Sequence, residues 1–260
     1  MMGSALAFPA AENGHEVHIV GTCLDDKIID GYLATGKHEK FCRPFPENVN
    51  YHYFKDWKTV VEGSDFVIGG VSSFGVDWFL EEILIQLDPE MPVLSVTKGL
   101  RATDDGSLLS YPGYWMSELA KRGIHRDICA VGGPCTSYEL VFKDPTEVAF
   151  CGWDNEVLRM MKQAMQRPYY HISLTNDVIG LESAVALKNA YAMAVTLAVG
   201  LNIRWHGEEE VQHFNSQAGT FTQAVRETHA LMLLQGGEFE SECIGCLLYT
   251  SDAADDKARV

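Results

Sequence analysis

Hydrophobic and polar residues follow two different patterns along the chain, and the change falls near Thr175. Before it, short runs rich in β-branched and aromatic residues predict buried strands at residues 15–21, 64–71, 92–97, 128–132, 146–150 and 169–173. Helical periodicity predicts helices between them, at residues 3–14, 25–33, 77–86, 114–121 and 155–166. Residues 34–61 contain prolines, and we expect an irregular segment there. Because strands and helices alternate, residues 1–175 predict an α/β domain with a mostly parallel sheet.

After Thr175 the pattern predicts helices only. Residues 178–194 are apolar or small almost all the way round a helix, which is typical of a helix in a core. Thr175 or Asn176 can cap this helix, with Asp177 in its first turn, where the helix dipole favours an anion. A second helical region covers residues 207–235 and is polar at residues 208–210. We therefore expect an incomplete all-α domain at residues 176–245.

One cation, Lys188, interrupts the apolar surface of the first of these helices, and an amide, Asn189, follows it. Burial disfavours the ammonium form of lysine, so a lysine in a core is a candidate acid or base. The alternative is that its four-carbon stem reaches water at the edge of the helix.

Small and charged residues also follow three of the predicted strands. Ligands of α/β sheets bind outside the carboxyl ends of the strands, which is where these residues are expected. The turn at residues 71–75 could let a cofactor approach the backbone, and Lys98 places a cation before a glycine. Backbone N–H groups around Gly133 and Cys135 could line an anion site. Each segment can instead serve only as a turn.

The first helix, at residues 3–14, has no strand in front of it. In a dinucleotide-binding βαβ unit Gly3 would be the third glycine of a G-x-G-x-x-G motif, which follows a first strand. We therefore expect a Rossmann-like sheet whose first strand is missing. The alternative is that Met1 is the true start and Gly3 only a small helix residue. Residues 246–260 resemble translated sequencing adapter and are set apart from the fold.

Composition narrows the function classes. The net charge of −16, from 20 basic and 36 acidic residues, opposes binding to nucleic acid or to an anionic membrane. It does not oppose a small anion held by a local cluster of cations. We expect no membrane span and no basic leader, hence a cytoplasmic protein. The 7 cysteines are scattered, which predicts reduced thiols. Cys243 and Cys246, the one pair with metal or redox spacing, are discounted, so no metal site is expected.

Short motifs follow one another in a fixed order along residues 2–245. They are Met2-Gly-Ser-Ala-Leu-Ala7, Asn13-Gly-His-Glu-Val17, Val71-Ser-Ser73, Thr97-Lys-Gly-Leu100, Gly133-Pro134, Glu139, Pro145-Thr146, Asp177-Val-Ile-Gly-Leu-Glu182 and Ala186-Leu-Lys-Asn189. Their order resembles the bacterial-type NAD(P)-dependent glycerol-3-phosphate dehydrogenases. The resemblance implies hydride transfer between sn-glycerol 3-phosphate and NAD or NADP, with dihydroxyacetone phosphate as the oxidised product. It also implies a supply of substrate for glycerophospholipid synthesis.

The resemblance further implies roles for single residues. Lys188 would accept the proton of the C2 hydroxyl, or donate it in reduction, and Lys98 would act beside it as a second catalytic cation. The implied cofactor contacts are Gly3, Ser4, Val71, Ser72, Ser73, Lys98 and Ser137. The implied substrate contacts are Lys98, Gly133, Cys135, Lys188 and Asn189. The partner is then a small phosphorylated substrate, and a homodimer is one assembly that we consider.

Several positions depart from the family pattern. Cys135-Thr136 replaces a Ser or Thr followed by Phe, and the arginine expected after Phe221 is missing. The strand at residues 15–21 is followed directly by neither an acid that would bind a ribose nor an arginine that would bind a 2′-phosphate, so the preference between NAD and NADP stays open. The later substrate-binding elements of the family pattern are absent from this sequence. Without its first strand the sheet should either split or close a gap. We therefore expect the 260-residue chain to be poorly stable and inactive. Two alternatives stay open: another two-domain NAD(P)-dependent hydroxy-acid dehydrogenase, and a nucleotide-binding module without catalysis.

Overall fold

The computed structural model describes residues 1–104, 106–207 and 214–238. The first part of the chain forms an α/β unit, with five strands in the order β3-β4-β7-β8-β9. Only β8 runs antiparallel to a neighbour, β7, and the other pairs are parallel. The strands are β3 Val67–Gly69, β4 Val93–Ser95, β7 Ile128–Gly132, β8 Thr146–Cys151 and β9 Tyr170–Thr175. The predicted α/β fold with a mostly parallel sheet is confirmed.

The remaining parallel strands form a separate piece. β1 Val17–Val20 pairs with β2 Val49–His52 in a two-stranded sheet that makes no ladder with β3. The amides at both ends of β1 face β2, because Val17 donates to the Asn48 carbonyl and Gly21 to the His52 carbonyl. Among the described strands none pairs with the other edge of β1. Of the two outcomes that the sequence left open, a split sheet and a closed gap, the described strands show the split sheet.

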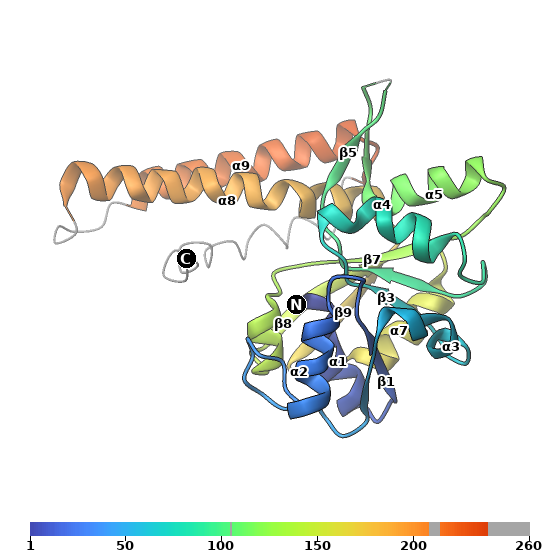
Figure 1. Cartoon of the computed structure of the whole chain (residues 1–260). Helices are drawn as coiled ribbons and strands as arrows, with labels where there is room; N and C mark the ends of the chain where they lie inside the picture. The colour runs from blue at the N-terminus through green and yellow to red at the C-terminus, as the bar shows by residue number, and fades with distance from the viewer. Residues whose placement is uncertain (105, 208–213, 239–260) are drawn as a thin grey trace.

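Helices cover both faces of the larger sheet, as the doubly wound arrangement requires (Figure 1). Successive residues of β4 show the alternation, since Val93 packs in one core cluster and Leu94 in the other. The cluster with Leu94 holds α1 and α7, and the cluster with Val93 holds α4 and α5. The helices are α1 Met2–Glu12, α2 Asp26–Thr35, α3 Trp57–Val61, α4 Val76–Phe79 with a π-helical continuation Leu80–Leu84, α5 Tyr111–Lys121, α6 Ser137–Val141 and α7 Asn155–Met165.

Three local predictions were wrong. The segment at 34–61 contains β2 and α3, whose short, mixed sequences give weak strand and helix signals. A hairpin of β5 Leu100–Ala102 and β6 Leu108–Ser110 was missed, because each strand has only 3 residues. Helix α5 begins at Tyr111 and not after Pro112-Gly113, since proline is tolerated in a first turn and the Ser110 hydroxyl caps the Gly113 amide.

The helices after the sheet form a long hairpin that projects away from it (Figure 1). α8 Val178–His206 has 29 residues and α9 is Phe214–Leu234. The cap of α8 is Asp177, which accepts a hydrogen bond from the Gly180 amide, so the predicted caps Thr175 and Asn176 were wrong. The boundary near 175 between two domains stays a prediction.

The prediction that residues 178–194 form a core helix holds only for the first two turns. Val178, the residues 180–185 and Val195 are buried, whereas Met193 is 70% exposed and Trp205 69% exposed. By length and composition alone α8 could cross a membrane, so the expectation that no segment is long enough was wrong. The first turns of α8 are buried against the sheet, and a core helix of a globular protein meets the same criteria of length and composition. Residues 208–210, Cys243, Cys246 and the segment 246–260 lie outside the described residues.

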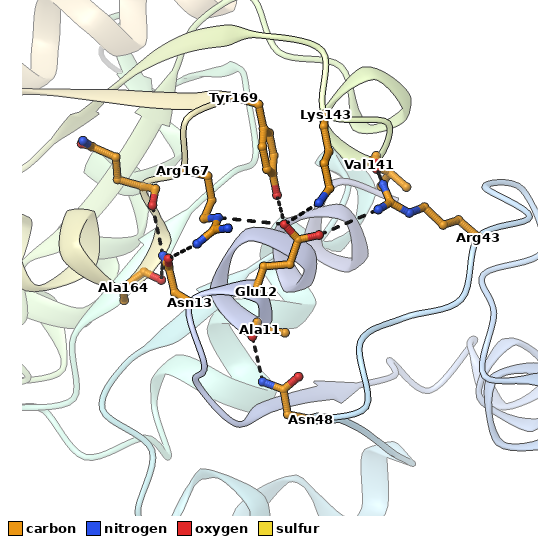
Figure 2. Close-up of polar contacts among 11 residues, drawn as sticks. Ala11, Glu12, Asn13, Arg43, Asn48, Val141, Lys143, Ala164, Arg167 and Tyr169 are labelled. Atoms are coloured by element: carbon orange, nitrogen blue, oxygen red, sulfur yellow. Dashed lines mark hydrogen bonds and ion pairs between the residues drawn. The ribbon is translucent and has the colours of Figure 1, made fainter.

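A polar network holds the far end of α1 (Figure 2). The Glu12 carboxylate accepts a hydrogen bond from the Tyr169 hydroxyl at 2.9 Å and lies 3.1 Å from Lys143 Nζ. Arg43 and Arg167 lie 3.9 Å from it on either side. The network joins α1 to three separate loops, and it fixes the helix whose other end reaches the carboxyl edge of the sheet.

Candidate active site

The carboxyl ends of β3, β4 and β7 meet at one edge of the sheet, because these strands are parallel neighbours. Val71 lies just beyond β3, Lys98 just beyond β4 and Gly133 just beyond β7. The Thr97 hydroxyl donates to the Val71 carbonyl at 2.7 Å, which ties the first two loops together. The structure therefore brings three of the predicted segments to one edge.

The first turn of α1 packs against the end of β3. A Cβ placed on Gly70 would lie 2.9 Å from Gly3 Cα, so the two backbones approach at a distance that only glycine allows. The first amides of α1 have no partner within the helix, and with the helix dipole they favour an anion. This glycine-lined cradle fits the pyrophosphate of a dinucleotide. The Ser4 hydroxyl lies instead 3.4 Å from the Tyr32 hydroxyl of α2.

Helix α8 packs directly on the end of β7. A Cβ on Gly132 would lie 2.5 Å from Val185 Cγ2, so a larger residue there would push the helix away. Gly133 has a φ of +150°, and a Cβ there would lie 2.9 Å from the Glu147 carbonyl oxygen. A small cavity opens beside these glycines, of about 20 Å³ and lined by Met2, Leu6, Val96, Lys98, Val131, Gly132, Gly133, Cys135, Val148 and Tyr170.

The charges of two lysines act on the thiol of Cys135. Burial raises the pKa of Cys135 to about 11, while the charges of Lys98 and Lys188 act to lower it. Lys98 lines the same small cavity as this thiol. Lys98 is exposed and Lys188 is half-buried, which lies between the two possibilities considered for Lys188, a buried cation and a stem that reaches water. The pair of cations beside glycine loops suits an anionic ligand.

The other predicted residues surround this centre less closely. Ser72, Ser73 and Asn189 are exposed, and Ser137 is the first residue of α6, where Thr136 supplies the cap. A larger hollow of about 530 Å³ lies along α7 and is lined by Arg159, Lys162, Gln163, Gln166 and Leu174. None of these residues comes from the loops beyond β3, β4 and β7, so the hollow is separate from the glycine loops.

The structure adds two groups that sequence reasoning passed over. Phe74 is 97% exposed in the turn after β3 and offers a bare aromatic face beside Ser72 and Ser73. Glu182 is 3% exposed on α8, and burial raises its pKa to about 8 although Lys98 acts to lower it. An acid in an apolar helix is the same signal that identified Lys188, and it could have identified Glu182.

Comparisons with known proteins agree with this geometry. The family described as NAD-dependent glycerol-3-phosphate dehydrogenase N-terminus matches residues 1–158. An NADP(+)-dependent glycerol-3-phosphate dehydrogenase of Archaeoglobus fulgidus is 29% identical over 240 residues, which are 92% of this chain and 69% of that protein. A glycerol-3-phosphate dehydrogenase [NAD(P)+] of Francisella philomiragia is 26% identical and covers 99% of this chain and 73% of that protein.

Solved structures show the same fold. A glycerol-3-phosphate dehydrogenase from Coxiella burnetii superposes with a TM-score of 0.79 at 20% identity, over 97% of this chain and 75% of that one. The Dunaliella salina enzyme superposes with a TM-score of 0.78 at 18% identity, over 99% of this chain and 45% of that one.

Proposed function

The chain belongs to the NAD-dependent glycerol-3-phosphate dehydrogenase family, and on this premise we propose that it binds NAD or NADP and interconverts sn-glycerol 3-phosphate and dihydroxyacetone phosphate. The observation that carries the proposal is the small cavity at the carboxyl edge of the sheet that Lys98 lines together with Gly132, Gly133 and Cys135, where the charges of Lys98 and Lys188 both act on the thiol. The nicotinamide, when bound, gives or accepts the hydride. The first turn of α1, with Gly3 against Gly70, holds the pyrophosphate.

The two lysines have different roles in the proposed reaction. Lys188 takes the proton of the C2 hydroxyl during oxidation and returns it during reduction. Once protonated, it also stabilises negative charge that develops on the C2 oxygen. Lys98 adds a second positive charge that attracts the phosphorylated substrate. The backbone around Gly133 and Cys135 lies beside both cations and completes the substrate site.

Ligand binding tests this proposal better than an activity assay does, because the sheet beside α1 is split and we still expect low turnover by this chain. sn-Glycerol 3-phosphate is titrated calorimetrically into the chain with NADH or NADPH present, a pair that cannot react. Lys98→Ala and Lys188→Ala should each weaken its affinity roughly ten- to hundredfold, since a charged hydrogen bond contributes about 1.5–3 kcal/mol.

Lys121→Ala is the matched control, because Lys121 pairs with Glu118 on the surface of α5, away from the glycine loops. Equal affinities in all variants would contradict the proposed site. Preference for a hydroxy acid without phosphate would favour the hydroxy-acid dehydrogenase alternative, and dinucleotide binding alone would favour the non-catalytic module. A cytoplasmic location, a homodimer, a role in phospholipid synthesis and the absence of nucleic-acid and membrane partners stay predictions.

A further inference from the structure

Glu182 lies in the second turn of α8, where the helix is pressed against the sheet. Its side chain is 3% exposed, and its Oε2 atom has no hydrogen-bond partner among the described residues. Buried polar atoms are almost always paired, so an orphan carboxyl oxygen next to a binding site requires an explanation.

The surroundings of Glu182 are almost entirely apolar. The start of α8 packs with Ala130 of β7, Ala149 and Cys151 of β8 and Met232 of α9. Within this packing cluster the titratable residue is Cys151, and burial also raises the pKa of its thiol. The charge of Lys98, beyond β4, acts on the Glu182 carboxyl and opposes the effect of burial.

Neighbouring polar groups on the same helix are already engaged. Asp177 caps the Gly180 amide at 2.8 Å, and Ser183 donates to Gln235 of α9 at 2.9 Å. The strand β6, which also packs against α8, contributes no titratable side chain. No described residue donates a hydrogen bond to the Glu182 Oε2 atom, and the buried Thr228 hydroxyl of α9 is not bonded to it either, so the neutral acid is the form that this site favours.

The charge state of Glu182 affects how strongly Lys98 attracts an anionic ligand. An ionised Glu182 would compete with the substrate phosphate for Lys98, whereas a neutral one leaves the cation free. We propose that Glu182 is a positioning residue that stays protonated at neutral pH, keeps Lys98 available to the substrate phosphate, and weakens anion binding when it ionises. This inference rests on the proposed function of Lys98.

The test measures the proton and the ligand separately. In the chain labelled with ¹³C-glutamate, infrared spectra should show a protonated carboxyl C=O band at pH 7 that disappears by pH 9 and is absent from Glu182→Gln. Calorimetry then gives the affinity for sn-glycerol 3-phosphate, with NADH present, at both pH values. The affinity of the unmodified chain should fall roughly tenfold more than that of Glu182→Gln, since Gln cannot ionise and a buried charge is weakly screened by solvent.

Glu227→Gln on α9 is the matched control and should behave like the unmodified chain, because Glu227 is exposed. Absence of the carboxyl band at pH 7, or coincident pH dependence of affinity in the unmodified chain and Glu182→Gln, would overturn the proposal. The band is read in the unmodified chain, so it does not depend on whether the Glu182→Gln variant folds correctly. A band that titrates while sn-glycerol 3-phosphate binds to no variant would overturn the proposed function instead, and with it the role of Lys98.

Discussion

The substitution Glu182→Gln should make the stability of the chain less sensitive to alkaline pH. Burial raises the pKa of Glu182 to about 8 in the folded chain, against 4.5 for an ordinary glutamate. A tenfold change in proton affinity corresponds to about 1.4 kcal/mol, so this difference amounts to about 5 kcal/mol. The side chain is 3% exposed, so solvent screening does not reduce that figure much.

The sign of the effect follows from which state holds the proton. Below pH 4.5 both states of Glu182 are protonated, and its full contribution to the free energy of unfolding is present. As pH rises to about 8, only the unfolded chain releases the proton, so the contribution is lost and stays lost above that pH. Glu182→Gln has no such proton to lose, and it should therefore become increasingly more stable than the unmodified chain between pH 5 and pH 8.

Urea unfolding followed by tryptophan fluorescence measures this difference at pH 5, 6, 7, 8 and 9. Trp115 is fully buried and reports loss of the core. Glu227→Gln is a control of opposite sign, because hydrogen bonds from Gln223 and Tyr191 lower the pKa of Glu227, and its contribution is lost as pH falls. A constant difference between the unmodified chain and Glu182→Gln across this range would refute the argument for a buried neutral acid.

Other substitutions test the frame around the site. Gly70→Ala places a methyl 2.9 Å from backbone in the first turn of α1, and it should lower the free energy of unfolding by about 1–3 kcal/mol and weaken NADH binding. Gly31→Ala meets open space and should be stabilising by up to about 1 kcal/mol, so equal urea midpoints for the two would contradict the close approach. Glu12→Gln should cost about 1–3 kcal/mol in the same assay. Glu118→Gln, which loses a single pair with the exposed Lys121, should cost less than about 1 kcal/mol; similar losses would show that the network of Figure 2 adds nothing. Cys135, with a pKa of about 11, should react with iodoacetamide at pH 8 more slowly than the exposed cysteines, and faster labelling would contradict its burial.

The sequence predicted the sheet well where the strands are long and buried. β7, β8 and β9 have 5 or 6 residues, and local patterns detect the apolar runs of β7 and β8 and the alternation of apolar and polar residues along β9. β2, β5 and β6 are shorter and half-exposed, and their formation depends on partners far along the chain. The antiparallel direction of β8 also depends on tertiary packing, since strand direction leaves no local signature.

The candidate site was predicted in its parts and less well in its environment. The strand-end rule places Val71, Lys98 and Gly133 at one edge, and the structure has them there. The apolar composition around Lys188 predicts burial, but burial needs a neighbour, and the described helices leave Lys188 half-covered and Asn189 exposed. The acid Glu182, which has the same apolar sequence context, lies nearer the sheet on the same helix and is buried.

β1 and β3 belong to separate sheets, and this separation affects local unfolding of the chain. A two-stranded sheet is only marginally stable by itself, so β1 and β2 should form a separate unit of local unfolding. Their amides should exchange with deuterium well before those of the fully buried β4. Because α1 leads directly from the glycine cradle into β1, each opening of that unit would also loosen the helix that holds the pyrophosphate. A bound dinucleotide should then slow amide exchange in β1 and β2, on strands that it does not touch.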